Sequence, residues 1–308
     1  MSTEGSIAIT GATGFVGQAV LDVAAARGAP IRALTRREPT QVRDAVEWVR
    51  GSLSDRASLC RLVAGAQAVI HIAGLTSTLF PEEFEGANVT GTQNVIDAMK
   101  TAKVKRLIFV SSLAAREPSL SAYGASKARA EALVEASGLD WTTVRPPGVY
   151  GPRDVDYLDM FRTAKWGFVP LPPGGASSII HVGDLAALLL DLVNAPPALV
   201  RRKVFEPDDG REGGWSHKEL ARAIGTAVGR RVFAPHLPAG ILGTAARADR
   251  LLRGKGAKLT ADRVGYMCHP NWVSRSNKAV PATVWQPEIE GRSGLASTAE
   301  WYREEGWL

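Results

Sequence analysis

The glycine-rich segment that starts at Thr10 constrains the fold of this 308-residue chain more than any other feature. It reads Thr10-Gly11-Ala12-Thr13-Gly14-Phe15-Val16-Gly17, follows the apolar run Ile7–Thr10 and opens the helical pattern Phe15–Arg27. Glycines at these positions permit a tight turn and let the backbone approach a pyrophosphate at the helix N-terminus. The segment therefore predicts a dinucleotide-binding strand–turn–helix unit rather than a plain connection.

Short β-branched and apolar runs alternate with longer helical patterns through the first half of the chain. Three expected helices end at or near a glycine, which favours helix termination. They are Phe15–Arg27, Asp55–Val63 and Ala122–Ala136. Such alternation predicts an α/β fold with a doubly wound parallel sheet of the Rossmann type. The expected strands are Ile7–Thr10, Ile31–Leu34, Val46–Val49, Ala68–Ile72, Leu107–Val110 and Trp141–Val144.

From about Val149 onward, prolines and glycines interrupt the chain, which indicates a second, smaller lobe. We assign residues 1–165 and 178–206 to the nucleotide-binding domain, and 166–177 and 207–308 to a mostly helical substrate-binding lobe. Lys203–Glu206 is an expected strand. Ser216 and Glu219 form a capping box that predicts a helix reaching about Val228.

One further helix is expected in this lobe over the apolar segment Leu237–Leu252, which carries Arg247, Asp249 and Arg250. Its pattern is amphipathic. We favour packing over the substrate cleft, with contact to a membrane surface as the alternative.

Charge and targeting signals exclude several classes of function. The net charge is +6 and the pI about 9.5, but the basic residues are scattered, so we expect no nucleic-acid partner. Cys60 and Cys268 show no metal-ligand spacing, and we expect neither a disulfide nor a metal. With no signal-peptide pattern and no apolar run of about 18 residues, we expect a cytoplasmic protein without a membrane span.

Tyr123 and Lys127 are the candidate acid–base pair. Their i, i+4 spacing on a helix places both side chains on one face, where the ammonium stabilises a phenolate. Because free tyrosine has a pKa of about 10, a neighbouring cation is needed for acid–base work near neutral pH. Ser112 follows an expected strand and can hydrogen-bond a substrate oxygen; Ser111 is the less favoured alternative.

Several motifs in sequence order resemble the extended short-chain dehydrogenases/reductases, the NAD-dependent epimerase/dehydratase family. The resemblance covers roughly the first two-thirds of the chain and implies an NAD(P)-dependent enzyme in which Ser112, Tyr123 and Lys127 are catalytic. Besides the glycine motif, the matching segments are Ala68–Ala73, Asn88–Asn94, Val110–Ser112, Tyr123–Lys127, Arg145–Pro152 and His181–Ala186.

Two departures make the chain an atypical member. Gly51-Ser52 stands where the family usually has an aspartate after the glycine, so the adenine contact differs. Leu113-Ala114 follows Ser112 in place of the acidic pair typical of sugar-nucleotide dehydratases, which disfavours elimination chemistry.

The residue after the second strand selects the cofactor. An acidic residue there binds the ribose 2′-hydroxyl of NAD, whereas arginine accommodates a 2′-phosphate. Here Arg36 and Arg37 follow Thr35, so we expect NADP through Arg36, with NAD as the alternative. The full set of expected cofactor-binding residues is Gly11, Thr13, Gly14, Phe15, Val16, Gly17, Arg36, Ser52, Leu53, Ile72, Ala73, Gly74, Asn88, Val110, Ser111, Tyr123, Lys127, Pro146, Gly148 and Val149.

The expected function is hydride transfer between the nicotinamide and a hydroxyl or ketone of a small-molecule substrate. Candidate substrate contacts are Thr76, Ser112, Tyr150 and Arg153, while His71 and His181 are interpreted as hydrogen-bonded core residues. One alternative is a sugar-nucleotide epimerase that acts through a transient ketone. The other is a non-catalytic NADP(H)-binding sensor or assembly factor. The resemblance also allows a homodimer.

Overall fold

A computed structural model describes residues 5–38, 43, 45–254, 257 and 259–308, and the chain divides into two compact units. The first unit comprises Met1–Arg145, Leu185–Phe205 and Val280–Trp285. The second comprises Pro146–Asp184, Glu206–Ala279 and Gln286–Leu308. Residues 146–165, 178–184 and 206, which the sequence pattern had grouped with the nucleotide-binding domain, cluster with the second unit, whereas residues 280–285, expected in the substrate-binding lobe, cluster with the first.

The first unit is built on a seven-stranded parallel sheet, and the predicted α/β fold class is confirmed. The strand order is β10-β6-β5-β4-β1-β2-β3. From β1 the chain adds β2 and β3 on one side, then returns to add β4, β5, β6 and β10 on the other, so the topological switch point lies between β1 and β4. The strands are β1 (Ile7–Thr10), β2 (Ile31–Thr35), β3 (Val46–Arg50), β4 (Ala68–His71), β5 (Arg106–Val110), β6 (Asp140–Val144) and β10 (Lys203–Phe205).

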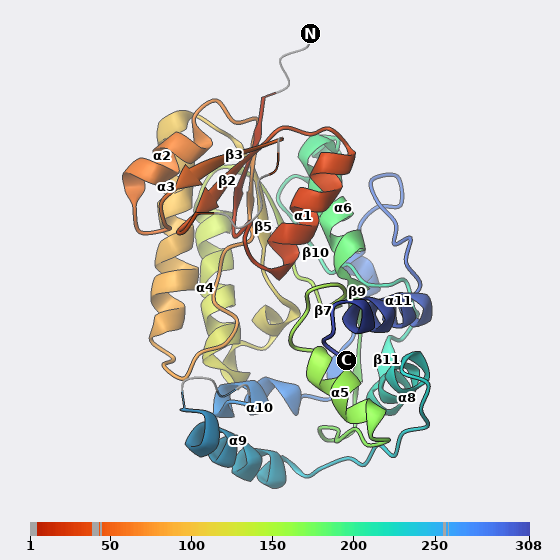
Figure 1. Cartoon of the computed structure of the whole chain (residues 1–308). Coiled ribbons are helices and arrows are strands. Elements are labelled where there is room, and N and C mark those ends of the chain that lie inside the picture. Colours follow the sequence, from red (N-terminus) through yellow and green to blue (C-terminus); the bar gives the residue numbers. More distant parts are fainter. Residues whose placement is uncertain (1–4, 39–42, 44, 255–256, 258) are drawn as a thin grey trace. The chain divides into compact units, whose positions relative to one another are not determined.

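Helices cover both faces of this sheet, so its central strands β1 and β4 are buried along their whole length and are apolar up to their last residues, Thr10 and His71. In Figure 1, α2 (Arg56–Val63), α3 (Gly91–Ala102) and α4 (Ala122–Ala136) lie on one face. α1 (Phe15–Ala26) and α6 (Val182–Asn194) lie on the other, and the short α7 (Pro197–Val200) precedes β10. The core under the first group includes Val69, Leu107, Leu62, Met99 and Val134.

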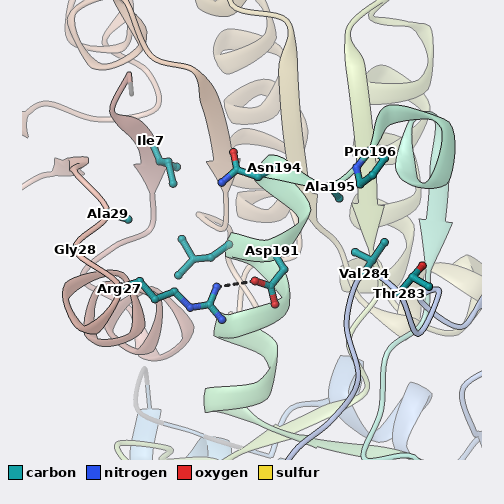
Figure 2. A pocket seen from close by; sticks show the side chains of 11 residues that line it. Ile7, Arg27, Gly28, Ala29, Asp191, Asn194, Ala195, Pro196, Thr283 and Val284 are labelled. Carbon is teal, nitrogen blue, oxygen red and sulfur yellow. Dashed lines mark hydrogen bonds and ion pairs between the residues drawn. The ribbon is translucent and has the colours of Figure 1, made fainter. Parts of the chain in front are cut away.

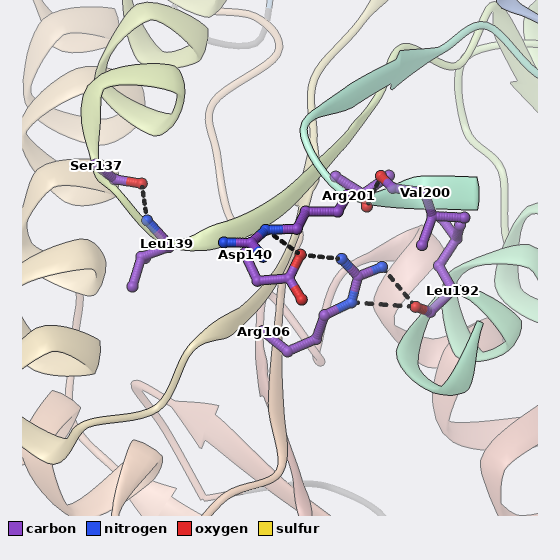
Figure 3. Close-up of polar contacts among 8 residues, drawn as sticks. Arg106, Ser137, Leu139, Asp140, Leu192, Val200 and Arg201 are labelled. Atoms are coloured by element: carbon purple, nitrogen blue, oxygen red, sulfur yellow. Dashed lines mark hydrogen bonds and ion pairs between the residues drawn. The ribbon is translucent and has the colours of Figure 1, made fainter. Parts of the chain in front are cut away.

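Arg106 joins helix α6 to the amino-terminal edge of the sheet (Figure 3). Its Nε and Nη2 donate to the Leu192 carbonyl at 3.2 and 2.6 Å, and Nη1 donates to the Asp140 carboxylate at 3.2 Å. The guanidinium thus satisfies a carbonyl in the last turn of α6, a position that favours cations.

The second unit is mostly helical, as expected, and also contains two small sheets. Its helices are α5 (Leu158–Lys165), α8 (His217–Ala227), α9 (Ala239–Arg253), α10 (Ala261–Met267) and α11 (Gly291–Glu304). Parallel strands β7 (Gly148–Tyr150) and β9 (Ile179–His181) form one small sheet; β11 (Trp215–Ser216), β8 (Ala176–Ser177) and β12 (Asn271–Trp272) form another. The capping box is confirmed: Ser216 Oγ accepts from Glu219 N, and the Glu219 carboxylate accepts from Ser216 N.

Candidate active site

The glycine turn after β1 has the geometry of a dinucleotide cradle. Gly11 has φ +78°, and a Cβ at this residue would lie 2.6 Å from the backbone nitrogen of Ala73. A Cβ on Gly17 would lie 2.6 Å from Ala12 Cα, so α1 packs directly on the turn. Gly14 is the exposed N-cap of α1, without a side-chain cap or an acidic residue in the first turn. The backbone N–H groups in the first turn of α1 therefore fit a pyrophosphate.

Most of the predicted site residues lie beyond the carboxyl ends of adjacent parallel strands in the first unit, which brings them to one edge of the sheet. The turn residues Thr13, Phe15 and Val16 follow β1, and Arg36 follows β2. Ser52 and Leu53 follow β3; Ile72, Ala73, Gly74 and Thr76 follow β4; Val110 ends β5, and Ser111 and Ser112 come next. Asn88 lies in a π-helical segment, Glu85–Thr90, that leads into α3.

Five predicted residues instead belong to the second unit. They are Pro146, Gly148, Val149, Tyr150 and Arg153. Tyr150 is fully buried in the core of that unit, where its ring lies 5.4 Å from His181. Arg153 has φ +72°.

Helix α4 begins where it can hold Tyr123 against the Ser112 segment. Ser121 caps the helix by accepting from Gly124 N at 2.9 Å. A Cβ on Gly124 would lie 2.6 Å from the Ala114 carbonyl oxygen, so the glycine lets the first turn approach the 3₁₀ turn Leu113–Arg116. Ser112 caps that turn, since its hydroxyl oxygen accepts from Ala114 N at 3.2 Å. The Tyr123 ring is buried against Phe84, with centroids 5.8 Å apart.

Lys127 lies one helical turn after Tyr123 and is buried. Its Nζ donates to the Val110 carbonyl at 2.8 Å and lies 4.9 Å from the centroid of the Phe109 ring. Burial lowers the pKa of Lys127 to about 8, while the negative charge of Glu131 acts in the opposite direction. The ammonium is therefore held at the end of β5 and titrates close to neutrality.

Glu131, one turn further along α4, is a site residue that the sequence interpretation missed. Its buried carboxylate accepts from the Ser111 hydroxyl, from Arg145 Nε at 2.9 Å and from Arg145 Nη2 at 2.5 Å. The i, i+4 spacing from Lys127 was the available signal. Of the two serines, Ser111 is buried and donates its hydroxyl to Glu131 on α4, whereas Ser112 is the more exposed.

His71 links the glycine turn to α3. Its Nδ1 lies 2.6 Å from Thr10 Oγ1, and its Nε2 lies 3.0 Å from Thr92 Oγ1. The Thr92 hydroxyl donates to the Asn88 carbonyl at 2.6 Å, so it accepts from Nε2–H, and Nδ1 accepts from Thr10. Burial and the charge of Lys127 lower the pKa of His71 to about 3. A neutral, fully hydrogen-bonded ring agrees with its interpretation as a core residue.

The Asn88 side chain extends this hydrogen-bonded chain to α4. Its Oδ1 accepts from Leu75 N at 2.7 Å, and its Nδ2 donates to Ser126 Oγ at 2.9 Å. Ser126 in turn donates to the carbonyl of Tyr123 at 2.7 Å. Asn88 therefore ties the segment after β4 to the first turn of α4.

The end of the sheet that follows β2 and β3 offers cations and hydroxyls. Arg36 and Arg37 are exposed, and Thr35 Oγ1 accepts from Arg37 N at 3.3 Å. Ser52 Oγ lies 2.9 Å from Ser54 Oγ, and the Leu53 carbonyl accepts from Asn94 Nδ2 at 2.8 Å. No carboxylate lies among residues 35–37 or 51–54, so these segments hold no negative side chain that would repel the ribose 2′-phosphate of NADP.

A hollow of about 340 Å³ in the first unit lies away from these residues (Figure 2). Ile7 at the start of β1, Gly28 before β2 and Pro196 before β10 line it, and Arg27 donates to Asp191 at 2.7 Å. These are the amino-terminal ends of the strands, the edge opposite the Tyr123 site. We assign this hollow no part in the chemistry.

Several known proteins are similar to this chain. A family model described as NAD(P)H-binding matches residues 11–196. A ceramide reductase from Caulobacter vibrioides is 36% identical over 320 residues, covering 100% of this chain and 98% of that protein.

Two further proteins are similar to the chain. A 4-hydroxy-2-methyl-3-oxo-4-farnesyl-3,4-dihydroquinoline-1-oxide ketoreductase from Stigmatella aurantiaca is 33% identical over 59% of this chain and 62% of its own length. The crystal structure of gox2253 has a TM-score of 0.78 with 25% identity and covers 98% of this chain and 99% of that one. Among the described residues, no helix is long and apolar enough to cross a membrane.

Proposed function

Because the chain belongs to the NAD(P)-binding extended short-chain dehydrogenase/reductase family, and is therefore an NAD(P)-dependent enzyme, we propose that it reduces a ketone on a lipid-like substrate with NADPH. The observation that carries the proposal is the arrangement of Ser112, Tyr123 and Lys127. Helix α4 holds the tyrosine beside the serine-capped turn and the buried ammonium at the end of β5.

Each of the three side chains has a role in the proposed reaction. A bound NADPH supplies the hydride to the carbonyl carbon. The Ser112 hydroxyl donates a hydrogen bond to the carbonyl oxygen and orients it. Tyr123 gives its phenolic proton to that oxygen as negative charge develops, and the Lys127 ammonium stabilises the phenolate left behind.

Arg36 supports NADP over NAD. It is exposed directly after β2, where a guanidinium can pair with a ribose 2′-phosphate, and no carboxylate among residues 35–37 can take the 2′-hydroxyl of NAD. Replacing Arg36 with alanine should raise the Kd of NADPH about tenfold, equivalent to one charge-assisted hydrogen bond, and leave that of NADH unchanged. Equal binding of the two cofactors by the native protein contradicts this assignment.

The relatives' names support a substrate class. One is named for a ceramide, and the other for a 3-oxo compound with a farnesyl chain. Both names describe molecules with a long hydrocarbon chain. We therefore propose a ketone on such a chain as the substrate, reduced to a secondary alcohol.

The direct test is NADPH oxidation by the purified protein, followed by absorbance. The substrates are a ceramide whose secondary alcohol has been oxidised to a ketone, a short water-soluble ketone and UDP-glucose. Tyr123→Phe should lower turnover about 10²- to 10⁴-fold while NADPH still binds. Turnover of UDP-glucose to an epimer without net NADPH oxidation is the result that overturns the proposal.

A further inference from the structure

Three aromatic side chains of the second unit are exposed, and they lie in two backbone segments that are hydrogen-bonded to each other. Trp166 is 88% exposed, Phe233 70% and Phe168 43%. The Phe168 and Phe233 rings lie 6.3 Å apart, Phe233 N donates to the Gly167 carbonyl at 2.8 Å, and Val169 N donates to the Phe233 carbonyl at 3.0 Å. This exposed apolar area is unusual, because large aromatic side chains are normally buried.

Exposed basic residues lie in the same two segments and on helix α8. Phe233 shares a surface hollow with Lys218 and Arg222, which lie four residues apart on α8. Lys165, Arg230 and Arg231, next to the aromatic residues in sequence, are exposed as well. We call this set the aromatic–basic surface: Lys165, Trp166, Phe168, Lys218, Arg222, Arg230, Arg231 and Phe233.

Acidic residues are nearly absent from the segments that form this surface. Residues 165–168, 218–222 and 230–234 contain one carboxylate, Glu219. It accepts from Ser216 N in the capping box and pairs with Arg211 at 3.1 Å. The five cations of the aromatic–basic surface therefore give it a strong positive charge.

The packing beneath holds this surface in place. Leu220 and Ile224 bury one side of α8, which leaves Lys218 and Arg222 on the solvent side. A Cβ on Gly225 would lie 2.9 Å from the Arg230 carbonyl oxygen and 2.8 Å from Val232 Cγ1. The 230–233 segment is thus pressed against α8, and the aromatic and basic groups are presented together.

We propose that the aromatic–basic surface docks the protein on an anionic lipid bilayer. Aromatic rings favour the interface between headgroups and acyl chains, and lysine and arginine pair with anionic headgroups. A nucleic acid also attracts cations and rings, but base stacking needs separate, open ring faces. Here the Phe168 and Phe233 rings lie beside each other, tilted by 37° with their centroids 6.3 Å apart, and form a joint apolar patch, which suits insertion between lipids. Docking is independent of the proposed hydride transfer.

Vesicle co-sedimentation tests the docking. The full chain should co-sediment with vesicles of roughly equal parts phosphatidylcholine and phosphatidylglycerol, far less with pure phosphatidylcholine, and less at high salt. Trp166→Ser/Phe233→Ser and Lys218→Glu/Arg222→Glu should each lower the bound fraction roughly tenfold. The matched control is Leu251→Ser/Leu252→Ser on α9, which removes two leucines that are 87% and 86% exposed outside this surface.

Two readouts separate docking from misfolding and from catalysis. The native protein should show a blue shift of tryptophan emission on anionic vesicles that Trp166→Phe abolishes, and all surface variants should keep the native circular dichroism and turnover of a soluble ketone. Equal binding by the native and surface variants overturns the proposal. So does loss of binding only in the α9 control, or binding to single-stranded RNA that outcompetes the vesicles.

Discussion

The Glu131 carboxylate accepts two hydrogen bonds from the Arg145 guanidinium, at 2.9 and 2.5 Å, in a buried bidentate pair. Its charge also acts on Lys127, one helical turn earlier on α4, against the burial that lowers the pKa of Lys127 to about 8. Arg145 follows β6 and fixes the direction of this carboxylate. The pair therefore links Arg145, at the end of β6, to the protonation state of Lys127, the ammonium proposed to stabilise the Tyr123 phenolate.

Replacing Glu131 with glutamine should shift the pH dependence of reduction. Lys127 is charged below its pKa and loses its proton as pH rises through it, so activity that needs the ammonium falls on the alkaline side. Without the neighbouring negative charge the pKa of Lys127 drops below 8, and the alkaline loss of kcat/KM should move to lower pH by about one unit. Lys127 also faces Tyr123 on its own helix and His71 on β4.

Glu135→Gln is the matched control for this shift, because Glu135 is an exposed carboxylate on the same helix. Its pH profile should coincide with that of the native protein. A coincident profile for Glu131→Gln as well would mean that Glu131 has only a structural role beside Arg145.

The two serines after β5 should respond differently to alanine. Ser112→Ala removes the proposed hydrogen bond to the substrate oxygen and should lower kcat about 10²-fold with unchanged NADPH binding. Ser111→Ala removes a hydroxyl that donates to Glu131, so it should cost about 1–2 kcal/mol of unfolding free energy with little loss of turnover. Steady-state kinetics and denaturant unfolding of both variants check this, and the reverse pattern would move the catalytic role to Ser111.

Local sequence signals predicted the strands of the first unit and the candidate catalytic helix. The glycine motif shows why. A Cβ on Gly17 would collide with Ala12 in the motif itself, and a Cβ on Gly11 would collide with Ala73 just after the adjacent strand β4, so local structure requires both glycines. The expected strand Ala68–Ile72 ends one residue early, at His71, and the other five expected strands of the first half lie within one residue of the observed bounds. Parallel pairing then collects the strand ends at one edge, which needs no further information.

Interactions that join distant segments could not be read in this way. His71 bonds Thr10, 61 residues away, and Thr92, 21 residues away, and nothing local to the strand names those partners. Glu131 meets Arg145 only because α4 leads into β6. The two-residue strands β8, β11 and β12 of the second unit are too short to show any alternation of apolar and polar residues.

Substitutions in the glycine turn test whether the close contact between α1 and the turn is needed for stability and for NADPH binding. Gly17→Ala places a methyl group 2.6 Å from Ala12 Cα, so the turn must move; we expect a loss of about 1–3 kcal/mol of stability and weaker NADPH binding. Gly14→Ala is the control, because its nearest contact would be 3.4 Å, from Gly11 O, at an ordinary N-cap conformation. Because Gly14 also lies in the proposed pyrophosphate cradle, only thermal unfolding compares the two variants: their stabilities should differ clearly, and equal stability would contradict the packing argument.

His71 should make the stability of the protein depend on pH between about 6.5 and 5. Its folded pKa of about 3 lies below the ordinary value of 6.5, so as pH falls through 6.5 the unfolded chain takes up a proton that the folded chain does not. The contribution of His71 is therefore complete above pH 6.5 and declines below it, by up to about 1.4 kcal/mol for each pH unit. His71→Gln removes this titration, so its unfolding free energy, measured with urea at several pH values, should fall less steeply between pH 6.5 and 5. Equal slopes for the two proteins would show that the folded protein takes up a proton on His71 as readily as the unfolded chain does, with Nδ1–H then donating to Thr10.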